Sequence, residues 1–232
     1  MNGGPYITRL CAWAPGVENS AEWDEWALGK RDISSGTQGP AIAFTDSLFR
    51  RRLSQISKMT VQVVHDLLPV GENTKIFFVS FRGELSRQFQ INKMLIEEKS
   101  LMPAAFSFSV FNAPVALASI ALGLKGGYSA LYPGNNSFSA GLAAAEAALL
   151  SEAALPSEAI VSDRQEELVF VYADEQAPPE YGRCFNNCLA FAFLLTRAPQ
   201  PTSVSLSLFR DADDPLDFLR RILLCGKLHA AS

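Results

Sequence analysis

Two adjacent amides stand where a helix begins, in the stretch SALYPGNNSFSAGLAAAEAALL at residues 129–150. A short β-like segment passes through a Pro-Gly turn to Asn135-Asn136 and then enters an alanine-rich helical pattern. The start of a helix favours anions, because its N–H groups are free and its dipole is positive there. Many enzymes place a nucleophile at such a position, but a carboxamide is not one.

Asparagine is also among the best N-cap residues, because its side-chain oxygen accepts a hydrogen bond from an N–H group of the first helical turn. A cap of this kind is worth ~0.5–2 kcal/mol relative to alanine. The sequence leaves two interpretations of Asn135 open, a helix cap and a catalytic amide, and favours the cap.

A hydroxyl nucleophile is the alternative at this place. The segment SFSAG, Ser137 to Gly141, approximates the strand-turn-helix elbow G-x-S-x-G of serine hydrolases, with Ser139 as nucleophile. Ser137 replaces the first glycine, and the base would have to be His229, close to the C-terminus. Three aspartates precede that histidine in the order required: Asp211, Asp213 and Asp214. A serine hydrolase using Ser139 is therefore an alternative prediction.

Composition and charge restrict the class of partner. The 232 residues carry a formal net charge of -4, with 48% hydrophobic and 19% charged residues, as is usual for a globular protein. This balance gives no reason to expect a nucleic acid or an anionic membrane surface as partner. The one basic run, Phe49-Arg50-Arg51-Arg52, opens a helical pattern, which favours a solvated or carboxylate-paired face over a polyanion site.

Neither a membrane span nor a metal site is expected. The longest apolar candidate, Ala140 to Leu150, contains Glu146 and is about half of the ~20 residues that a span needs. No charged-then-apolar leader begins the sequence, and we expect a cytoplasmic protein. Cys184 and Cys188 form C-x3-C without a nearby histidine, which indicates a pair of buried thiols rather than a metal site. We also expect no cofactor.

Apolar periodicity predicts alternating strands and helices. Strand-like runs occupy residues 6–13, 75–81, 128–132, 156–161, 167–172, 189–195 and 204–209. Helical patterns occupy residues 53–67, 84–98, 115–122, 140–150 and 216–224. The candidate inward positions of the helix at 84–98 are Leu85, Phe89, Met94 and Leu95. This order predicts a single domain over residues 1–232, with an α/β layered fold and a buried, mostly parallel central sheet covered by helices.

The run MPAAFSFSVFNAPVALASIALGLKGGYSALYPGN, residues 102–135, resembles the approach to the active site of β-ketoacyl synthases, the condensing enzymes of fatty-acid and polyketide assembly. The matching features are Pro103, Asn112, the apolar helix 115–122, the GLKG turn ending at Gly126, and the strand that follows. Counting on from Gly126 by the family's spacing places Asn135 where the nucleophilic cysteine stands. The resemblance implies the N-terminal half of a thiolase-like fold.

The chemistry of that family is missing from this chain. A synthase needs a thiolate that accepts the acyl chain, together with two histidines. Asn135 cannot form a thioester, and the only histidines, His65 and His229, stand outside the family's catalytic contexts. The resemblance therefore implies a subunit without catalytic residues, similar to chain-length factors, particularly those of aryl polyene pathways. The segments FRRRLSQISKMTVQVVHDLL and LVFVYADEQAPPEY resemble that group.

Such a subunit implies a partner. The resemblance predicts a heterodimer, or a dimer of heterodimers, with a full-length β-ketoacyl synthase, and contact with acyl carrier protein and its acyl chain through that partner. The segment FSFSVFNAP and the alanine-rich helix are candidate contacts, although alanines also allow close packing within one core. The expected interface residues are Phe108, Phe111, Asn112 and Asn136.

In this family the acyl chain grows toward the dimer interface, so the helix after Gly83 is expected to form the far wall of its tunnel. The expected wall residues are Glu84, Arg87, Gln88 and Ile91. A wall limits chain length because one more two-carbon unit overpacks it, at a cost of about 1–3 kcal/mol. A solvated helix face is the alternative for these largely polar residues. A stand-alone acyl-binding scaffold is the third alternative for the function.

Overall fold

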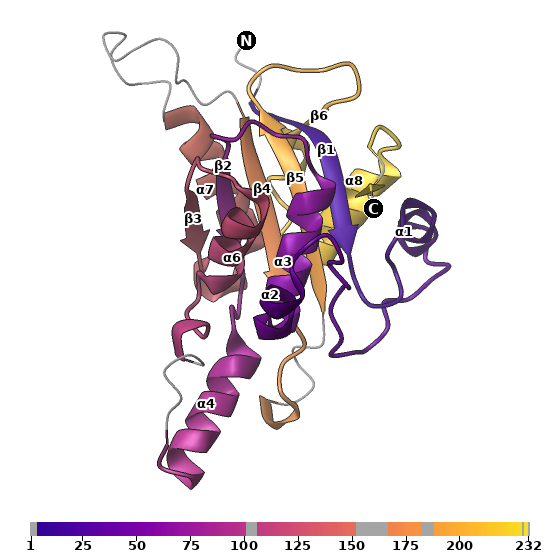
Figure 1. The fold of residues 1–232 in the computed structure, drawn as a ribbon. Coiled ribbons are helices and arrows are strands. Elements are labelled where there is room, and N and C mark those ends of the chain that lie inside the picture. Colours follow the sequence, from indigo (N-terminus) through magenta and orange to yellow (C-terminus); the bar gives the residue numbers. More distant parts are fainter. Residues whose placement is uncertain (1–3, 101–105, 152–166, 182–187, 229, 232) are drawn as a thin grey trace, which may run out of the picture.

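The computed structural model describes residues 4–100, 106–151, 167–181, 188–228 and 230–231, which form a layered α/β fold (Figure 1). The strands are β1 (Tyr6–Trp13), β2 (Lys75–Val79), β3 (Tyr128–Leu131), β4 (Glu167–Asp174), β5 (Leu189–Thr196), β6 (Val204–Ser205) and β7 (Ala230–Ala231). The helices are α1 (Ser20–Ala27), α2 (Ser47–Arg52), α3 (Gln55–Asp66), α4 (Leu85–Glu97), α6 (Ala113–Leu122), α7 (Phe138–Ser151) and α8 (Pro215–Leu224). The layered α/β architecture expected from the sequence is confirmed.

One sheet has the strand order β3-β2-β4-β5-β1-β6, and β7 also pairs with β1. β2 lies parallel to β3 and β4, whereas β5 lies antiparallel to both β4 and β1. The sheet is therefore mixed, and the expectation of a mostly parallel sheet is wrong. A parallel return needs a long crossover, usually a helix. The described part of the β4–β5 connection contains only the short 3-10 helix Pro179–Tyr181.

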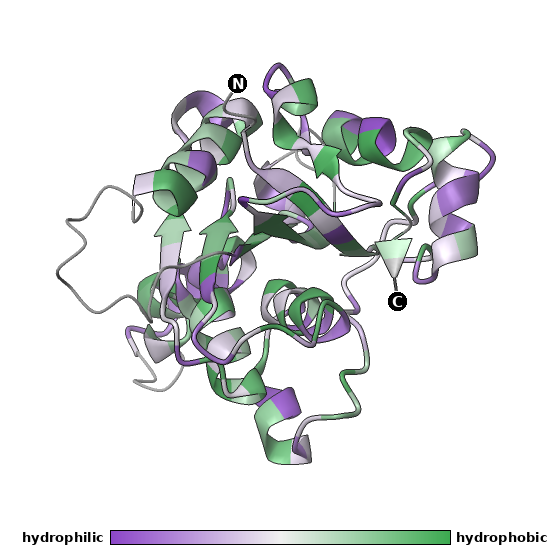
Figure 2. Ribbon diagram, turned by 90° about the horizontal axis from the view of Figure 1, so that it is seen from above, coloured by the Kyte–Doolittle hydropathy of each residue, from purple (hydrophilic) through white to green (hydrophobic). Residues whose placement is uncertain are grey.

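Alternate residues of the central strands face two different cores. Phe77 and Phe170 face a core shared with α1, α7 and α8, which is rich in aromatic rings. Ile76, Val169 and Ala192 face the core beneath α3 and α6. Figure 2, seen from above, shows helices on both faces of the sheet. Because both faces are covered, β2, β4 and β5 have the continuous apolar runs by which the sequence predicts them.

The strand expected at residues 204–209 is largely wrong. Only Val204–Ser205 pairs with β1, and the next four residues form the 3-10 helix Leu206–Phe209. Leu206 and Phe209 are both buried in the aromatic core. Residues three apart lie on the same side of a 3-10 helix. The spacing of Leu206 and Phe209 therefore reflects this helix and not the alternation of a strand. The strand expected at residues 156–161 lies outside the described residues.

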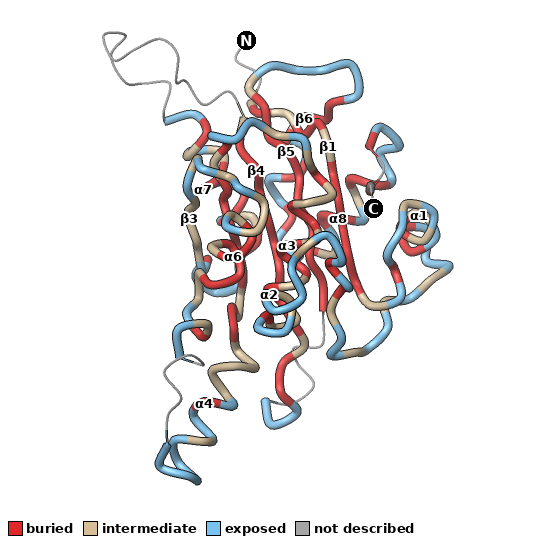
Figure 3. The backbone as a smooth tube through the Cα atoms, in the orientation of Figure 1, coloured by how far each residue is buried: buried red, intermediate tan, exposed pale blue. Residues whose placement is uncertain are grey.

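α4 extends away from the sheet, and its far end is exposed (Figures 1 and 3). Ile91 is its one buried residue, whereas Leu95 and Ile96 are 50% and 77% exposed. Of the four positions expected to face inward, Leu95 is wrong because it is exposed, whereas Leu85, Phe89 and Met94 are half-buried. Among the described residues, no helix combines the length and apolar character that crossing a membrane requires.

Candidate functional site

The C-terminal ends of the three parallel strands β2, β3 and β4 meet at one edge of the sheet. This edge is where ligands of parallel α/β sheets commonly bind. A pocket of about 300 Å³ opens there. Its lining residues come from the ends of β2 and β3, the start of α4 and two loops: Phe81, Arg82, Leu85, Tyr132, Asn136 and Tyr181. The expected site residues lie around this pocket and at the base of α4.

Asp174, the last residue of β4, organises the turn that follows β2. Its fully buried carboxylate accepts hydrogen bonds from Ser80 Oγ at 2.7 Å and from the backbone N–H groups of Phe81 and Arg82. The Tyr172 hydroxyl donates to its other oxygen at 2.5 Å. Burial raises the pKa of Asp174, whereas the charge of Arg82 and these hydrogen bonds lower it. The carboxylate is thus occupied in holding the loop and is not directed at a substrate.

The amide pair lies in a tight turn before α7. Asn135 and Asn136 are exposed and have left-handed backbone angles, with φ of 57° and 54°. Asparagine tolerates that conformation better than most residues. The expectation that Asn135 caps the helix is wrong, because Ser137 Oγ instead accepts the hydrogen bond from Ala140 N at 3.3 Å. Within the described part of the chain, the Asn135 carboxamide makes no hydrogen bond.

Ser139, the alternative nucleophile, lies in the first turn of α7. Its Oγ is 3.0 Å from Ser137 Oγ and donates a short hydrogen bond to Asp213. No described histidine accompanies this pair, because the His65 ring stacks on Phe44, with centroids 3.6 Å apart, and its Nδ1 contacts the neighbouring Asp66. His229 lies outside the described residues. The described geometry supplies a carboxylate but no imidazole for a hydrolytic triad.

Glu84, expected in the tunnel wall, is fully buried at the start of α4. Its carboxylate accepts hydrogen bonds from the hydroxyls of Ser54 and Ser57 at the start of α3, at 2.7 and 2.6 Å. Arg87 lies 3.4 Å from the other carboxylate oxygen. Burial raises the pKa of Glu84, and the hydroxyl contacts and Arg87 oppose that rise. The structure therefore places Glu84 beneath the α4 face, where it joins two helices.

A third buried acid, Glu175, follows directly after β4 and was not predicted. One carboxylate oxygen accepts a hydrogen bond from Ser86 N at 3.0 Å and the other from Ile56 N at 3.4 Å. These N–H groups belong to the first turns of α4 and α3, so one carboxylate serves two helix starts. Burial, followed by the nearby charge of Glu84, raises the pKa of Glu175 to about 7.

The other three expected tunnel residues follow along α4. The Arg87 guanidinium lies over the Phe108 ring, 5.5 Å from its centroid. Gln88 Nε2 donates to Ser109 O at 2.9 Å, and Ile91 is 7% exposed. These contacts tie the base of α4 to the segment that begins the expected interface.

A larger pocket, of about 610 Å³, opens beside the base of α4. Its lining residues include Ser54, Arg87, Phe89 and Glu175, so one wall is polar and the other partly aromatic. Gln88 and Ile91 are not among its described lining residues. Of the four expected tunnel residues, the structure thus brings Arg87 alone to this cavity.

The expected interface residues divide into packed and exposed members. Phe111 packs edge-on against Phe78 of β2, with centroids 6.1 Å apart. Asn112 Nδ2 donates to the Tyr128 hydroxyl at 3.1 Å, which fixes the start of α6. Asn136 is exposed and lines the 300 Å³ pocket. Phe111 and Asn112 therefore support the site from within the chain, and Asn136 is open to a partner.

The described cysteines do not supply a nucleophile to this edge. Cys11 and Cys188 are buried, and burial raises the pKa of each thiol to about 12. Cys225 is exposed at the end of α8. Cys184 lies outside the described residues, and among those described no group of three or more metal-binding side chains gathers.

Comparison with known proteins places this geometry in a family. A family model described as "Beta-ketoacyl synthase, N-terminal domain" matches residues 23–215, which is most of the chain. No curated protein matches the sequence.

Two solved structures share the fold. One is the ketosynthase ApeO in complex with its chain length factor ApeC from Xenorhabdus doucetiae, with 26% identity, a TM-score of 0.63, and coverage of 84% of this chain and 79% of that chain. The other, AntDE:AntF, is described as a type II PKS acyl-carrier protein in complex with its ketosynthase bound to the hexaketide. Its identity is 15%, its TM-score 0.54, and the coverage 85% of this chain and 64% of that chain, so it supports the fold alone. The chain therefore belongs to the β-ketoacyl synthase family, whose N-terminal domain it matches.

Proposed function

We propose that this chain is a non-catalytic chain-length-factor subunit, which pairs with an active β-ketoacyl synthase and shapes the tunnel in which a polyene or polyketide chain grows. The observation that carries the proposal is Asn135 at the entrance of α7, where the resemblance places the family's cysteine. Its carboxamide is exposed in a left-handed turn and cannot accept an acyl group. The condensing chemistry must then reside in another polypeptide.

Exposed apolar side chains support a partner of this kind. Four lie on the outer part of α4 and on the segment that follows it: Leu95, Ile96, Phe106 and Val110. Contiguous apolar surface is typical of a protein interface. In the proposal, Phe108 and Asn136 contact the synthase, and Phe111 and Asn112 hold that surface in place. The solved complex of a ketosynthase with its chain length factor is consistent with this pairing.

The base of α4 is the proposed tunnel wall. Arg87, Gln88 and Ile91 form its contact face, and Glu84 positions the helix from below through Ser54 and Ser57. An added two-carbon unit would overpack such a wall, at about 1–3 kcal/mol, which is enough to bias product length. Acyl carrier protein delivers its chain through the synthase partner. The aryl polyene type of product and a cytoplasmic location are part of the same proposal.

Co-expression with a full-length synthase and its carrier protein tests the proposal. Carrier-bound intermediates are measured by mass spectrometry for the wild-type pair and for pairs with Ile91→Ala or Gln88→Ala. Both variants are expected to lengthen the products, because each removes part of the wall. Asn92→Ala, on the exposed face of the same helix, is the matched control and is expected to leave the lengths unchanged.

Four results would contradict the proposal. Product lengths that do not respond to either wall variant argue against the tunnel. Condensation of malonyl thioesters by the purified chain alone argues against the missing nucleophile. Labelling of Ser139 by a fluorophosphonate would favour a hydrolase. A soluble homodimer that does not bind the synthase would favour a stand-alone acyl-binding scaffold.

A further inference from the structure

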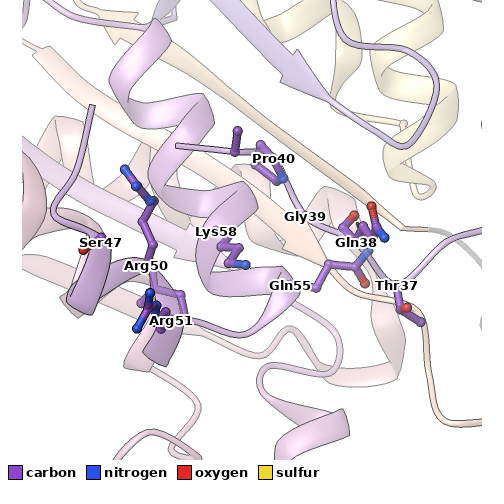
Figure 4. Close-up of a pocket in the computed structure, with 11 residues that line it drawn as sticks. Thr37, Gln38, Gly39, Pro40, Ser47, Arg50, Arg51, Gln55 and Lys58 are labelled. Atoms are coloured by element: carbon purple, nitrogen blue, oxygen red, sulfur yellow. Dashed lines mark hydrogen bonds between the residues drawn. The ribbon is translucent and has the colours of Figure 1, made fainter. Parts of the chain in front are cut away.

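A basic cavity lies away from the strand edge, between α2, the start of α3 and the loop at residues 37–41 (Figure 4). Its volume is about 550 Å³. Arg50 and Arg51 of α2 and Lys58 of α3 line it, together with the polar side chains of Thr37, Gln38 and Ser47. No aspartate or glutamate is among its described lining residues. The cavity therefore concentrates positive charge in a chain whose net charge is -4.

The three cations have no close carboxylate partner within the described part of the chain, although the charge of Arg50 helps to lower the pKa of Asp46. None of Arg50, Arg51 and Lys58 forms an ion pair there. Arg50 Nη1 donates to the carbonyl oxygens of Ala43 at 3.1 Å and Thr45 at 2.6 Å, which holds its guanidinium in place without removing its charge. The basic run was expected to be solvated or carboxylate-paired, and the solvated alternative fits, because Arg51 and Arg52 are exposed.

The nearest acidic group on the same helix is occupied elsewhere. Asp46 is the N-cap of α2, and one of its carboxylate oxygens accepts hydrogen bonds from the N–H groups of Leu48 at 2.8 Å and Phe49 at 3.2 Å. It is not one of the residues that line the cavity. The helix cap therefore uses this carboxylate, and the cations of the cavity remain available to an external anion.

The opposite wall is fixed by contacts of its own. Gln55 Nε2 donates to the carbonyl oxygens of Gly36 at 2.8 Å and Gln38 at 3.1 Å, which ties the loop to α3. Gly39 lies against the stem of Lys58, so that a Cβ at this glycine would stand 3.1 Å from Lys58 Cβ. Because the walls are built from internal contacts, a ligand would not have to order them.

We propose that this cavity binds the phosphoryl group of a small phosphorylated ligand. A guanidinium offers two parallel N–H donors to phosphate oxygens, and an ammonium adds a compact charge. Arg51 supplies the first, Lys58 the second, and the hydroxyls of Thr37 and Ser47 are further donors at the rim. Three cations suit a multiply charged anion better than a monoanionic carboxylate. This site is independent of the proposed chain-length function, because it involves neither Asn135 nor α4.

Calorimetric titration of the full chain, together with its synthase partner where pairing is needed for solubility, tests the site. The probes are pyrophosphate, inorganic phosphate and acetate. Pyrophosphate is expected to bind most tightly and acetate least. Binding is expected to weaken as salt is raised, because partly exposed charges are screened. Arg51→Gln and Lys58→Gln are each expected to weaken pyrophosphate binding about tenfold, as for loss of one charged hydrogen bond.

Arg52→Gln is the matched control, because it removes the same charge from the next residue of α2, which does not line the cavity. It is expected to change the affinity less than about twofold. Equal losses for the Arg51 and Arg52 variants would overturn the proposal in favour of diffuse surface charge. It would also be overturned if the wild-type chain bound pyrophosphate no better than acetate. Unfolding curves of the three variants verify that each is folded.

Discussion

α3 and α4 begin side by side at the same pair of buried carboxylates, yet they end in opposite environments. α3 lies on the sheet, and seven of its twelve residues are buried. α4 is one residue longer, but Ile91 alone is buried. Helices of this length owe most of their stability to packing of an apolar face. α3 thus finds its partner surface within the chain, and the exposed apolar residues of α4 fit the proposal that another chain supplies theirs.

Loss of core packing on α3 gives the largest expected effect. Met59→Ala, at a fully buried position, is expected to lower the free energy of unfolding by about 2–5 kcal/mol, because it leaves a cavity. Met94→Ala makes the same chemical change on half-buried α4 and is expected to cost less than about 1 kcal/mol. Urea unfolding of the full chain measures both. Equal losses would remove the distinction between the two helices.

The second-largest expected effect on the free energy of unfolding comes from the Glu175 carboxylate, which α3 and α4 share, and this effect depends on pH. The pKa of Glu175 rises from 4.5 to about 7 on folding, so the unfolded chain holds fewer protons in that window. This group's stabilising contribution is therefore present below about pH 4.5 and is lost as pH rises through about 7. The full shift corresponds to at most about 3 kcal/mol.

Glu175→Gln is expected to flatten that part of the stability profile. The measurement is the free energy of unfolding between pH 5 and 8, at ~0.5 unit intervals, for the wild type and the variant. Glu97→Gln, on the exposed part of α4, is the control and is expected to follow the wild type. A wild-type profile that runs parallel to that of Glu175→Gln would contradict a raised pKa at this position.

Removing a hydroxyl at the start of α3 or α4 is expected to lower the free energy of unfolding by a smaller amount. Ser54 caps α3 through Ser57 N at 3.1 Å, and its hydroxyl also donates to Glu84. Ser54→Ala is expected to cost about 1 kcal/mol, within the range for a lost cap. Ser86→Ala, which removes a 3.2 Å hydrogen bond from α4 to Gln176 O, is expected to cost about 0.5 kcal/mol. If the Ser86 variant were the less stable, α4 would be the helix better anchored within the chain.

The outer end of α4 gives the smallest effect on folding. Leu95→Ala is expected to change the free energy of unfolding of the chain by less than about 0.5 kcal/mol, because the side chain is half-exposed. The same variant is expected to reduce co-purification with a synthase. Lys93→Ala, two residues earlier on the helix, serves as the comparison for the pull-down. A destabilised chain with unchanged pairing would reverse the interpretation of this surface.

The sequence predicts α3 and the buried strands well because their pattern reflects neighbours within the same chain. It predicts that α4 is a helix but not which side is buried, since the apolar residues Leu95 and Ile96 lack a covering surface in the described structure. α1 was missed, although Asn19 and Glu22 form a capping box that the spacing N-x-x-E could have indicated. The mixed sheet was missed because strand direction depends on how the chain returns between strands.

At the site, the resemblance located the turn, but the role of its residues depended on backbone angles. Asn135 and Ser137 are two positions apart and both suit a cap, and only the structure distinguishes them. Glu175 could have been found, because an Asp-Glu pair at the end of a buried strand places charge at the edge of a sheet. The stretch ELVFVYADE contains that signal.

Glu175 directly follows β4, a central strand of the sheet, and its carboxylate accepts a hydrogen bond from the first turn of α4. The direction of α4 is consequently set by a buried central strand of the sheet. A helix whose orientation is already fixed loses little orientational freedom when it binds a partner. More of the contact energy is then available as affinity. Glu175, whose raised pKa lowers the stability of the fold near neutral pH, would then also fix the orientation of α4.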